Sequence, residues 1–377
     1  MSDSIEDMLD GVSVCICVGS GGVGKTTSSA AIAAGMAARG RKVAVLTIDP
    51  AKRLADSLGL HELGNEELRV DPALLERAGV DANGGELWAT MLDAKATFDE
   101  VVRRHSPDEE SRERILGNRI YQQISGALAG SQEYMAMERL YELSEDGGYD
   151  LLVLDTPPSR NALDFLDAPR RLIQFVDGRA IRVFIRPTGL GMRVAGRGFA
   201  IVHSLLKRLT GTDLIQELTE FFTAMSGMVG GFRQRAARVE ELLASEDTAF
   251  LIVCGPAGEP LQEAVYLREK LDDADLPFGG LIVNRVHRVD SEHADRPAPE
   301  EVREALGDAD LAERVIASYE AATALSERDA RNIEQLRERI GPAPMLQVPE
   351  RTEEVHDLAG LLALGPYLFG SSPPSQL

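Results

Sequence analysis

Residues 19–27 read GSGGVGKTT and fit the pattern G-x-x-x-x-G-K-[ST] of a phosphate-binding loop. Residues 12–18 before the loop are mostly β-branched and apolar, which predicts a short buried strand. Residues 26–39 after it are Ala-rich and contain no proline, which predicts a helix. Because a strand, a glycine loop and a helix form the context that this pattern requires, the stretch is interpreted as a nucleotide-binding loop rather than a plain glycine turn.

The residue types of this loop define its expected contacts with a nucleotide. Glycines allow backbone N–H groups to turn toward one anion, and the N-terminus of the helix adds partial positive charge. We expect Lys25 to reach the β- and γ-phosphates of ATP and the Thr26 hydroxyl to bind Mg²⁺. The loop residues expected to bind ATP are Gly21, Gly22, Val23, Gly24, Lys25, Thr26 and Thr27.

Two aspartates follow predicted buried strands. Asp49 follows the strand over 41–47, and Asp155 follows four apolar residues at the end of the strand over 149–154. Asp155 is in a Walker-B-type position and is expected to hold Mg²⁺ through water, whereas Asp49 is a candidate to orient or deprotonate the attacking water. The alternatives are an Asp-Pro turn that caps the next helix for Asp49 and a plain strand-to-turn junction for Asp155. The phosphate loop upstream favours the functional interpretation of both.

Strands and helices alternate along the chain, and each candidate ligand residue follows a strand. This alternation predicts an α/β fold with a doubly wound, mostly parallel sheet. Further strands are expected over 86–92, 249–254, 278–284 and 345–348, with long helical stretches between them and a final helix over 355–364. We expect one domain over 1–370, with a nucleotide-binding core at about 11–160 and 246–370, a helical subdomain at about 161–245, and a disordered tail over 371–377.

The ends of the last two predicted strands are candidates to bind the nucleotide base. Asn284 ends the strand over 278–284, and its side-chain amide can pair with a purine edge. The following residues, 285–287, lack the Asp of the guanine-reading N-K-x-D pattern, which favours ATP over GTP. Pro349 follows the last strand and is expected to flank the base.

Composition limits the expected compartment and partners. The 377 residues carry a net charge of −21, which argues against nucleic-acid binding. The first eleven residues are acidic and no apolar run is long enough to span a bilayer, so a cytoplasmic protein is expected. Cys15, Cys17 and Cys254 lie in predicted buried strands and are expected to be small core residues rather than a metal or redox group.

One segment reverses the charge of the chain. Residues 179–208 include seven basic residues and no acidic one, interleaved with apolar residues and glycines. Such a segment suits contact with a lipid surface or a membrane-protein client, which would place the protein peripherally at the membrane. The equal alternative is a solvated helix face that is basic.

Three motifs carry a resemblance to a known family. GSGGVGKTT at 19–27, TIDPAKRLADSLG at 47–59 and LDTPPSRNALDFLDAP at 154–169 resemble the arsenite-pump ATPases and the tail-anchored-protein-targeting ATPases, the last motif being most similar to an actinobacterial branch. The resemblance covers nearly the whole chain. It implies a phosphate-loop fold of the SIMIBI class and a Mg²⁺-dependent ATPase that works as a nucleotide-gated dimer.

The resemblance also implies roles for partners and for matching residues. The dimer would be a homodimer or a heterodimer with a related ATPase, and its helical subdomain would handle an apolar or membrane-associated client. Asp49 matches the acid of the first switch, which positions the hydrolytic water, and Asp155 matches the acid of the second switch near Mg²⁺. Asn284 and Pro349 match contacts to adenine.

The sequence departs from the family pattern in two places. Ser20 stands where the family has a lysine that reaches the partner's phosphates, so the replacement is Lys52, Arg53, Arg160 or a lysine of a different partner protomer. The chain also lacks the C-x-x-C zinc pair of the targeting ATPases and the separated cysteines that bind arsenite in the pumps, so neither zinc dimerisation nor arsenite transport is expected. Ser20 favours the alternative to an ATPase, which is a non-hydrolysing nucleotide switch or chaperone that forms half of a hetero-oligomer.

Overall fold

The computed structural model describes residues 4–49, 53–78, 84–124, 131–157, 229–289, 298–353 and 355–370. The strands of these ranges are β1 (Val14–Val18), β2 (Lys42–Thr47), β3 (Leu68–Arg69), β4 (Glu86–Met91), β5 (Leu151–Asp155), β6 (Thr248–Cys254), β7 (Phe278–Val286) and β8 (Met345–Pro349). They form one sheet in the order β3-β4-β2-β5-β1-β6-β7-β8. All neighbouring strands pair in parallel except β3 and β4, so the predicted α/β fold with a doubly wound, mostly parallel sheet is confirmed.

The central strand β1 lies where the strand order reverses. The chain leaves β1 toward β2 on one side of the sheet, and β6 pairs with the other edge of β1. Every residue of β1 and β5 is buried, because helices cover both faces of the sheet and the strands carry continuous apolar sequence. The loop that follows β1 therefore opens at a topological switch point, where parallel sheets bind ligands.

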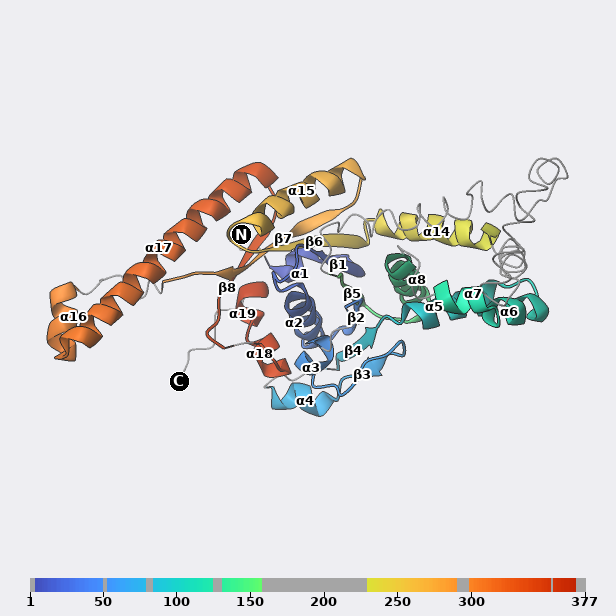
Figure 1. The fold of residues 1–377 in the computed structure, drawn as a ribbon, viewed down its shortest axis with the longest axis horizontal. Helices are drawn as coiled ribbons and strands as arrows, with labels where there is room; N and C mark the ends of the chain where they lie inside the picture. Colours follow the sequence, from blue (N-terminus) through green and yellow to red (C-terminus); the bar gives the residue numbers. More distant parts are fainter. Residues whose placement is uncertain are drawn as a thin grey trace, which may run out of the picture.

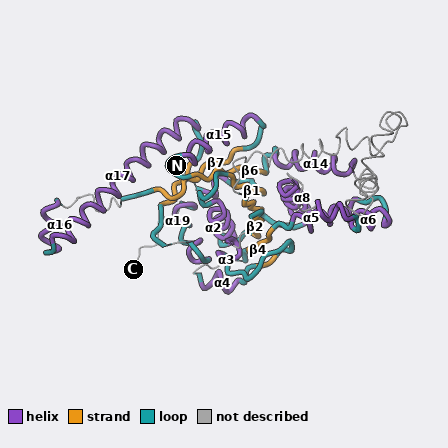
Figure 2. The backbone as a smooth tube through the Cα atoms, in the orientation of Figure 1, coloured by secondary structure: helices purple, strands orange, loops and turns teal. Residues whose placement is uncertain are grey.

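Helices cover both faces of the sheet (Figure 1), and the strands form a single band between them (Figure 2). On one face, Cys15 and Cys17 pack in an apolar cluster with α1 (Ile5–Met8), α2 (Lys25–Ala37), α18 (Leu358–Leu362) and α19 (Gly365–Leu368). On the other face, Val14, Ile16 and Cys254 pack with α8 (Ser131–Asp146), α14 (Val229–Leu243), α15 (Glu259–Asp273) and α17 (Ala309–Ile340). The remaining helices are α3 (Arg53–Ser57), α4 (Pro72–Arg77), α5 (Ala94–His105), α6 (Glu109–Leu116), α7 (Arg119–Ile124) and α16 (Pro299–Leu306).

Helices extend beyond the sheet at both ends of the molecule in Figure 1. Helices α5, α6 and α7 lie at one end beside α14, and the α16–α17 pair lies at the other. The buried residues of α17 are Ala312 near its start and then Asp329, Ile333, Leu336 and Ile340. Asp329 therefore marks the point at which α17 leaves the core. All three cysteines are buried and free, as the sequence predicts.

Two predicted boundaries are wrong. β7 does not end at Asn284 but continues to Val286 through a bulge, at which its register against β8 shifts. The helix expected over 355–364 is shorter than predicted, because α18 spans only Leu358–Leu362, and a second short helix, α19, follows at Gly365–Leu368. Pro366 lies in the first turn of α19, where the missing N–H leaves no helix hydrogen bond unmade.

Part of the predicted organisation lies outside the described residues. This applies to the basic segment over 179–208 and to most of the helical subdomain expected over 161–245, of which α14 is described. The division into core, subdomain and tail stays a prediction. Of the helices within the described ranges, none has both the length and the apolar character needed to cross a bilayer.

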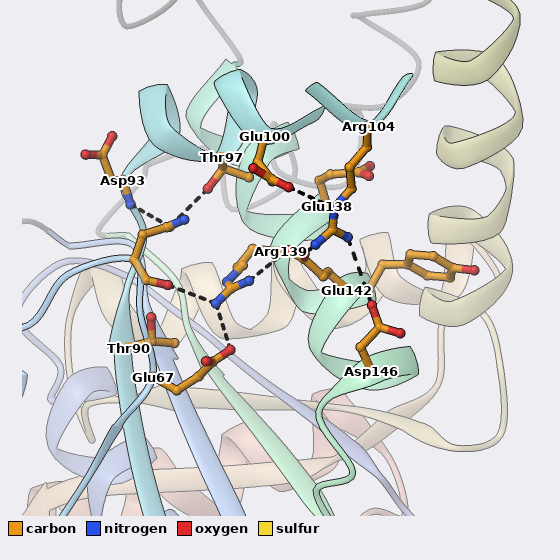
Figure 3. Close-up of polar contacts among 12 residues, drawn as sticks. Glu67, Thr90, Asp93, Thr97, Glu100, Arg104, Glu138, Arg139, Glu142 and Asp146 are labelled. Carbon is orange, nitrogen blue, oxygen red and sulfur yellow. Dashed lines mark hydrogen bonds and ion pairs between the residues drawn. The ribbon is translucent and has the colours of Figure 1, made fainter. Parts of the chain in front are cut away.

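Ion pairs join α8 to α5 and to the loop before β3 (Figure 3). The Arg139 guanidinium on α8 lies 2.7 Å from a carboxylate oxygen of Glu67 and donates to the Asn65 carbonyl at 2.8 Å. It also pairs at 2.8 Å with Glu142, which in turn pairs with Arg104 on α5. Because α8 leads directly into β5, these contacts fix the helix that precedes this central strand.

A buried ion pair joins α8 to α14. The Glu138 side chain on α8 is 2% exposed and pairs with the Arg235 guanidinium on α14. Glu138 also accepts a hydrogen bond from the Tyr134 hydroxyl at 3.1 Å. Since α14 follows residues 158–228 in the chain, this pair anchors the returning chain to the helix that precedes β5.

We expect Arg235→Leu to lower the free energy of unfolding by about 3 kcal/mol, because the variant leaves the Glu138 carboxylate buried without its partner charge. Urea denaturation at pH 7 measures this change. The matched control is Arg303→Leu, which removes the exposed pair between Arg303 and Glu313 and should cost less than about 1 kcal/mol. Equal losses in the two variants would contradict the importance assigned to the buried pair.

Candidate functional site

The loop between β1 and α2 has a backbone that requires glycine. Gly22 and Gly24 adopt φ values of 79° and 93°, in the left-handed region that glycine reaches without steric cost. A Cβ at Gly24 would also lie only 2.3 Å from Nδ2 of Asn284. The helix begins at Lys25, so its first N–H groups open toward the loop, as an anion site requires.

Lys25 lies over this loop and is 5% exposed. Its Nζ donates to the Ser20 carbonyl oxygen at 2.9 Å. Burial lowers the pKa of Lys25, and the nearby carboxylates of Asp155 and Asp49 oppose this shift. A bound polyanion would stabilise the ammonium form further, so the lysine is placed and poised to bind phosphate.

Asp155 is fully buried at the end of β5. One of its carboxylate oxygens, Oδ2, accepts hydrogen bonds from the Thr26 hydroxyl at 2.7 Å and from the Thr47 hydroxyl at 2.9 Å. Its other oxygen, Oδ1, is buried and has no hydrogen-bond partner among the described residues. Burial raises the pKa of Asp155 to about 6, against the effect of the two hydroxyl groups and of Lys25.

Asp49 lies at the same edge of the sheet. It follows β2 by two residues, and its backbone N–H donates to the Thr47 hydroxyl oxygen at 3.2 Å. The Thr156 hydroxyl donates to the Cys17 carbonyl at 2.8 Å and so ties the exit of β5 to β1. The structure thus gathers Lys25, Thr26, Asp49 and Asp155 at the carboxyl ends of three adjacent strands.

Asn284 and Pro349 lie at the carboxyl ends of β7 and β8. Nδ2 of Asn284 donates to the Val23 carbonyl at 2.8 Å, and its Oδ1 accepts from the Arg285 N–H at 3.0 Å. Pro349 pairs with Val286 across the two strands. The contacts of Asn284 support the phosphate loop, and the roles of Asn284 and Pro349 toward adenine stay predictions.

Sequence reasoning missed Thr47 and the loop-supporting role of Asn284. The register of β2 against β5 places Thr47 directly beside Asp155, and no sequence motif indicates this pairing. A polar residue at the end of an apolar strand is the signal that could have identified Thr47 once the neighbouring strands were known. Asn284 reaches Val23 from the bulge of β7, where Arg285 adopts a positive φ of 58°, and composition does not indicate this bulge.

The donors at this site fit Mg²⁺. Mg²⁺ prefers oxygen ligands and is usually held by one or two carboxylates together with substrate phosphates. Thr26 supplies a hydroxyl, and Asp155 supplies a carboxylate oxygen that has no hydrogen-bond partner in the part of the chain that the structure describes. Within the described ranges, no cluster of three or more His, Cys, Asp or Glu side chains could hold a metal ion.

Comparison with known proteins decides the family. The family model described as anion-transporting ATPase matches residues 12–297, which is more than half of the chain. The chain belongs to the anion-transporting ATPase family. The predicted family, and with it an enzyme that binds and hydrolyses ATP, is therefore confirmed.

Individual relatives are similar over most of the chain. A protein of Aquifex aeolicus designated an arsenical pump-driving ATPase is 26% identical over 371 residues, which are 95% of this chain and 79% of the relative. The ATPase get3 of Schizosaccharomyces japonicus is 24% identical over 286 residues, 75% of this chain and 78% of the relative. An ATPase ASNA1 homolog of Trypanosoma cruzi is 25% identical over 313 residues, 76% of this chain and 78% of the relative.

We expect Asp155→Asn to remove a pH-dependent loss of stability from the nucleotide-free protein. Burial raises the pKa of Asp155 to about 6 in the folded protein, above the value of about 3.9 in an unfolded chain. The folded state therefore binds the proton of the Asp155 carboxyl more tightly than the unfolded state does. The stabilisation of the folded state by this proton is complete below about pH 4 and is lost as the pH rises through about 6.

Relative to wild type, the Asp155→Asn variant should gain roughly 2–3 kcal/mol of unfolding free energy between pH 4 and pH 7.5. Urea unfolding at both pH values, without nucleotide or Mg²⁺, measures the difference. A difference between variant and wild type that is the same at both pH values would contradict the assigned cause.

Proposed function

We propose that this ATPase hydrolyses Mg²⁺-bound ATP in a nucleotide-gated dimer and uses the cycle to handle an apolar or membrane-associated client. The observation that carries the proposal is the buried Asp155 carboxylate, which bridges Thr26 and Thr47 and has one oxygen to which no described residue donates a hydrogen bond. This arrangement suits a divalent cation beside the phosphate loop.

Each residue of the site has a role that follows from its position. Lys25 would leave the Ser20 carbonyl and bind the β- and γ-phosphates, and the loop N–H groups would stabilise negative charge that develops in the transition state. Asp49 would orient the attacking water. Thr26 and Asp155 would hold Mg²⁺, which when bound supplies positive charge to the phosphates. Asn284 and Pro349 would contact adenine.

The path from the site to the client runs through β5 and α14. Asp155 and Thr156 lie at the site, and the chain continues from there into residues 158–228. It returns in α14, which Arg235 anchors to α8. We propose that nucleotide-dependent change at Asp155 is passed along this path, and that the basic segment over 179–208 contacts a membrane protein or lipid. Under this proposal the protein is cytoplasmic and peripherally attached to the membrane.

The proposed dimer must replace the charge that Ser20 cannot supply. Arg53 is exposed at the start of α3, four residues after Asp49, which makes it a candidate. Lys52 and Arg160, the other candidates within the chain, lie outside the described residues. In a heterodimer, a lysine of a related ATPase would serve instead. The partners are therefore a second copy or a related chain, and no nucleic acid.

We expect Lys25→Ala to lower phosphate release from Mg²⁺-ATP by roughly 100-fold or more, because it removes the cation at the γ-phosphate. Lys270→Ala is the matched control, since Lys270 is a half-buried lysine of α15 that pairs with Asp273 at 3.2 Å, and its turnover should equal wild type. Chelation of Mg²⁺ should abolish turnover in wild type and in Lys270→Ala. Phosphate release and particle mass are measured in the same samples, with and without ATP.

Three outcomes of this experiment differ in meaning. Lys25-dependent turnover with an ATP-induced dimer supports the proposal. ATP binding without turnover, restored by a related ATPase chain, supports the hetero-oligomer that Ser20 favours. Turnover that persists in Lys25→Ala, or that survives complete chelation, contradicts the assigned site.

A further inference from the structure

His287 joins three elements at the carboxyl end of β7. Its Nδ1 lies 2.7 Å from Oδ2 of Asp329 on α17, and its backbone N–H donates to the same oxygen at 3.1 Å. Its Nε2 lies 2.9 Å from Oε2 of Glu350, the residue that follows β8. The imidazole therefore bridges α17 and the end of β8.

We infer that His287 is a positioning residue for nucleotide binding, which fixes the turn after β8 against the point where α17 leaves the core. The inference rests on the proposed function, because Pro349 in this turn is the residue expected to flank the base. His287 does not need to touch the nucleotide in this role. It acts through Glu350, which adjoins Pro349 in the chain.

The Asp329 end of the bridge is rigid. Asp329 is fully buried, and its second oxygen accepts two hydrogen bonds from the Arg328 guanidinium, at 3.0 and 2.8 Å. Burial acts to raise the pKa of Asp329, but the hydrogen bonds from Arg328 and His287 hold that pKa below its ordinary value. Asp329 is therefore an ionised and fully engaged anchor. The neighbouring residues Ile333 and Leu336 pack in the core, so the anchor does not move independently of the sheet.

The bridge is complete only with a charged imidazole. An ionised carboxylate only accepts hydrogen bonds, and a neutral imidazole has one N–H to donate. Asp329 and Glu350 face the two ring nitrogens, so the imidazolium satisfies both and the neutral ring satisfies one. Arg328 on α17 binds the Asp329 carboxylate that faces the ring, and the Arg288 guanidinium, next in the chain, donates at 3.3 Å to Gln347 of β8.

The bridge adjoins the phosphate loop through the bulge of β7. Asn284 lies in this bulge and holds the Val23 carbonyl, and His287 follows it by three residues. The Glu350 N–H donates to the Val286 carbonyl at 3.0 Å, so the two strand ends remain paired without His287. Loss of the imidazole would release the turn after β8 while leaving the contacts of Lys25 and Asp155 intact. It should therefore weaken nucleotide binding and spare the chemical step.

The test measures KM and kcat for Mg²⁺-ATP in the full chain. We expect His287→Ala to raise KM by roughly tenfold and to change kcat by less than about twofold. Glu350→Ala removes one contact without disturbing the buried Asp329, and it should raise KM by a similar factor. In the double variant, KM should rise no further than in either single one, because both remove the same bridge. His61→Ala, which alters an exposed histidine of the loop after α3, is the matched control and should equal wild type.

Rescue by a conservative variant separates positioning from a general structural role. His287→Arg keeps a cation with N–H groups for both carboxylates, so it should retain most of the affinity that His287→Ala loses. Thermal melting without nucleotide shows whether each variant is folded. If a variant at His287 does not fold, the KM of Glu350→Ala carries the test.

Failure of the inference is distinct from failure of the proposed function. If wild type shows no Lys25-dependent turnover, the proposed function fails and this inference fails with it. If turnover depends on Lys25 but neither His287→Ala nor Glu350→Ala raises KM, the inference alone is overturned. A fall in kcat with unchanged KM would also overturn it.

Discussion

The buried carboxylate of Asp155 holds three elements of this ATPase in register. It accepts hydrogen bonds from Thr26 at the start of α2 and from Thr47 at the end of β2, and it ends β5 itself. Burial of an ionisable group is costly, and the pKa raised to about 6 expresses that cost. A bound divalent cation would reverse the effect by favouring the ionised form. In the proposed function, Mg²⁺-ATP would offset the cost of burying this carboxylate.

A second constraint joins the phosphate loop to the far side of the sheet. The bulge in β7 turns Asn284 toward the Val23 carbonyl, and Gly24 must lack a side chain for the amide to fit. The strand continues to Val286, from which His287 reaches α17 and Glu350. The phosphate side and the expected base side of the site are therefore parts of one hydrogen-bonded unit.

The sequence predicted the parts of this structure that depend on local pattern. The loop, its strand and its helix are encoded within about 25 residues, so Lys25 and Thr26 could be located from the motif. Asp155 could be located because an apolar strand that ends in Asp is itself a local pattern, and the alternation of strands and helices predicted the sheet. Asp49 lies at the expected edge of the sheet, although its role toward water stays a prediction.

Features that depend on pairs of distant residues could not be predicted in this way. Thr47 meets Asp155 across 108 residues, and His287 meets Asp329 across 42, so neither contact leaves a periodic signal. The bulge that extends β7 depends on a positive φ at Arg285, a residue type that does not favour it. The two-residue β3 is too short to show alternation, and the buried pair of Glu138 and Arg235 resembles ordinary surface charge in the sequence.

The most direct test of the account is the effect of Mg²⁺ on ATP affinity in wild type, Thr26→Ser and Thr26→Val, measured by calorimetry with and without the metal. The account predicts that Mg²⁺ strengthens binding by roughly tenfold or more, about 1.4 kcal/mol, in the two proteins that keep the hydroxyl. In Thr26→Val the strengthening should fall below about twofold, while affinity for metal-free ATP stays close to wild type. An equal effect of Mg²⁺ in all three proteins would contradict the assignment of the metal to Thr26 and Asp155.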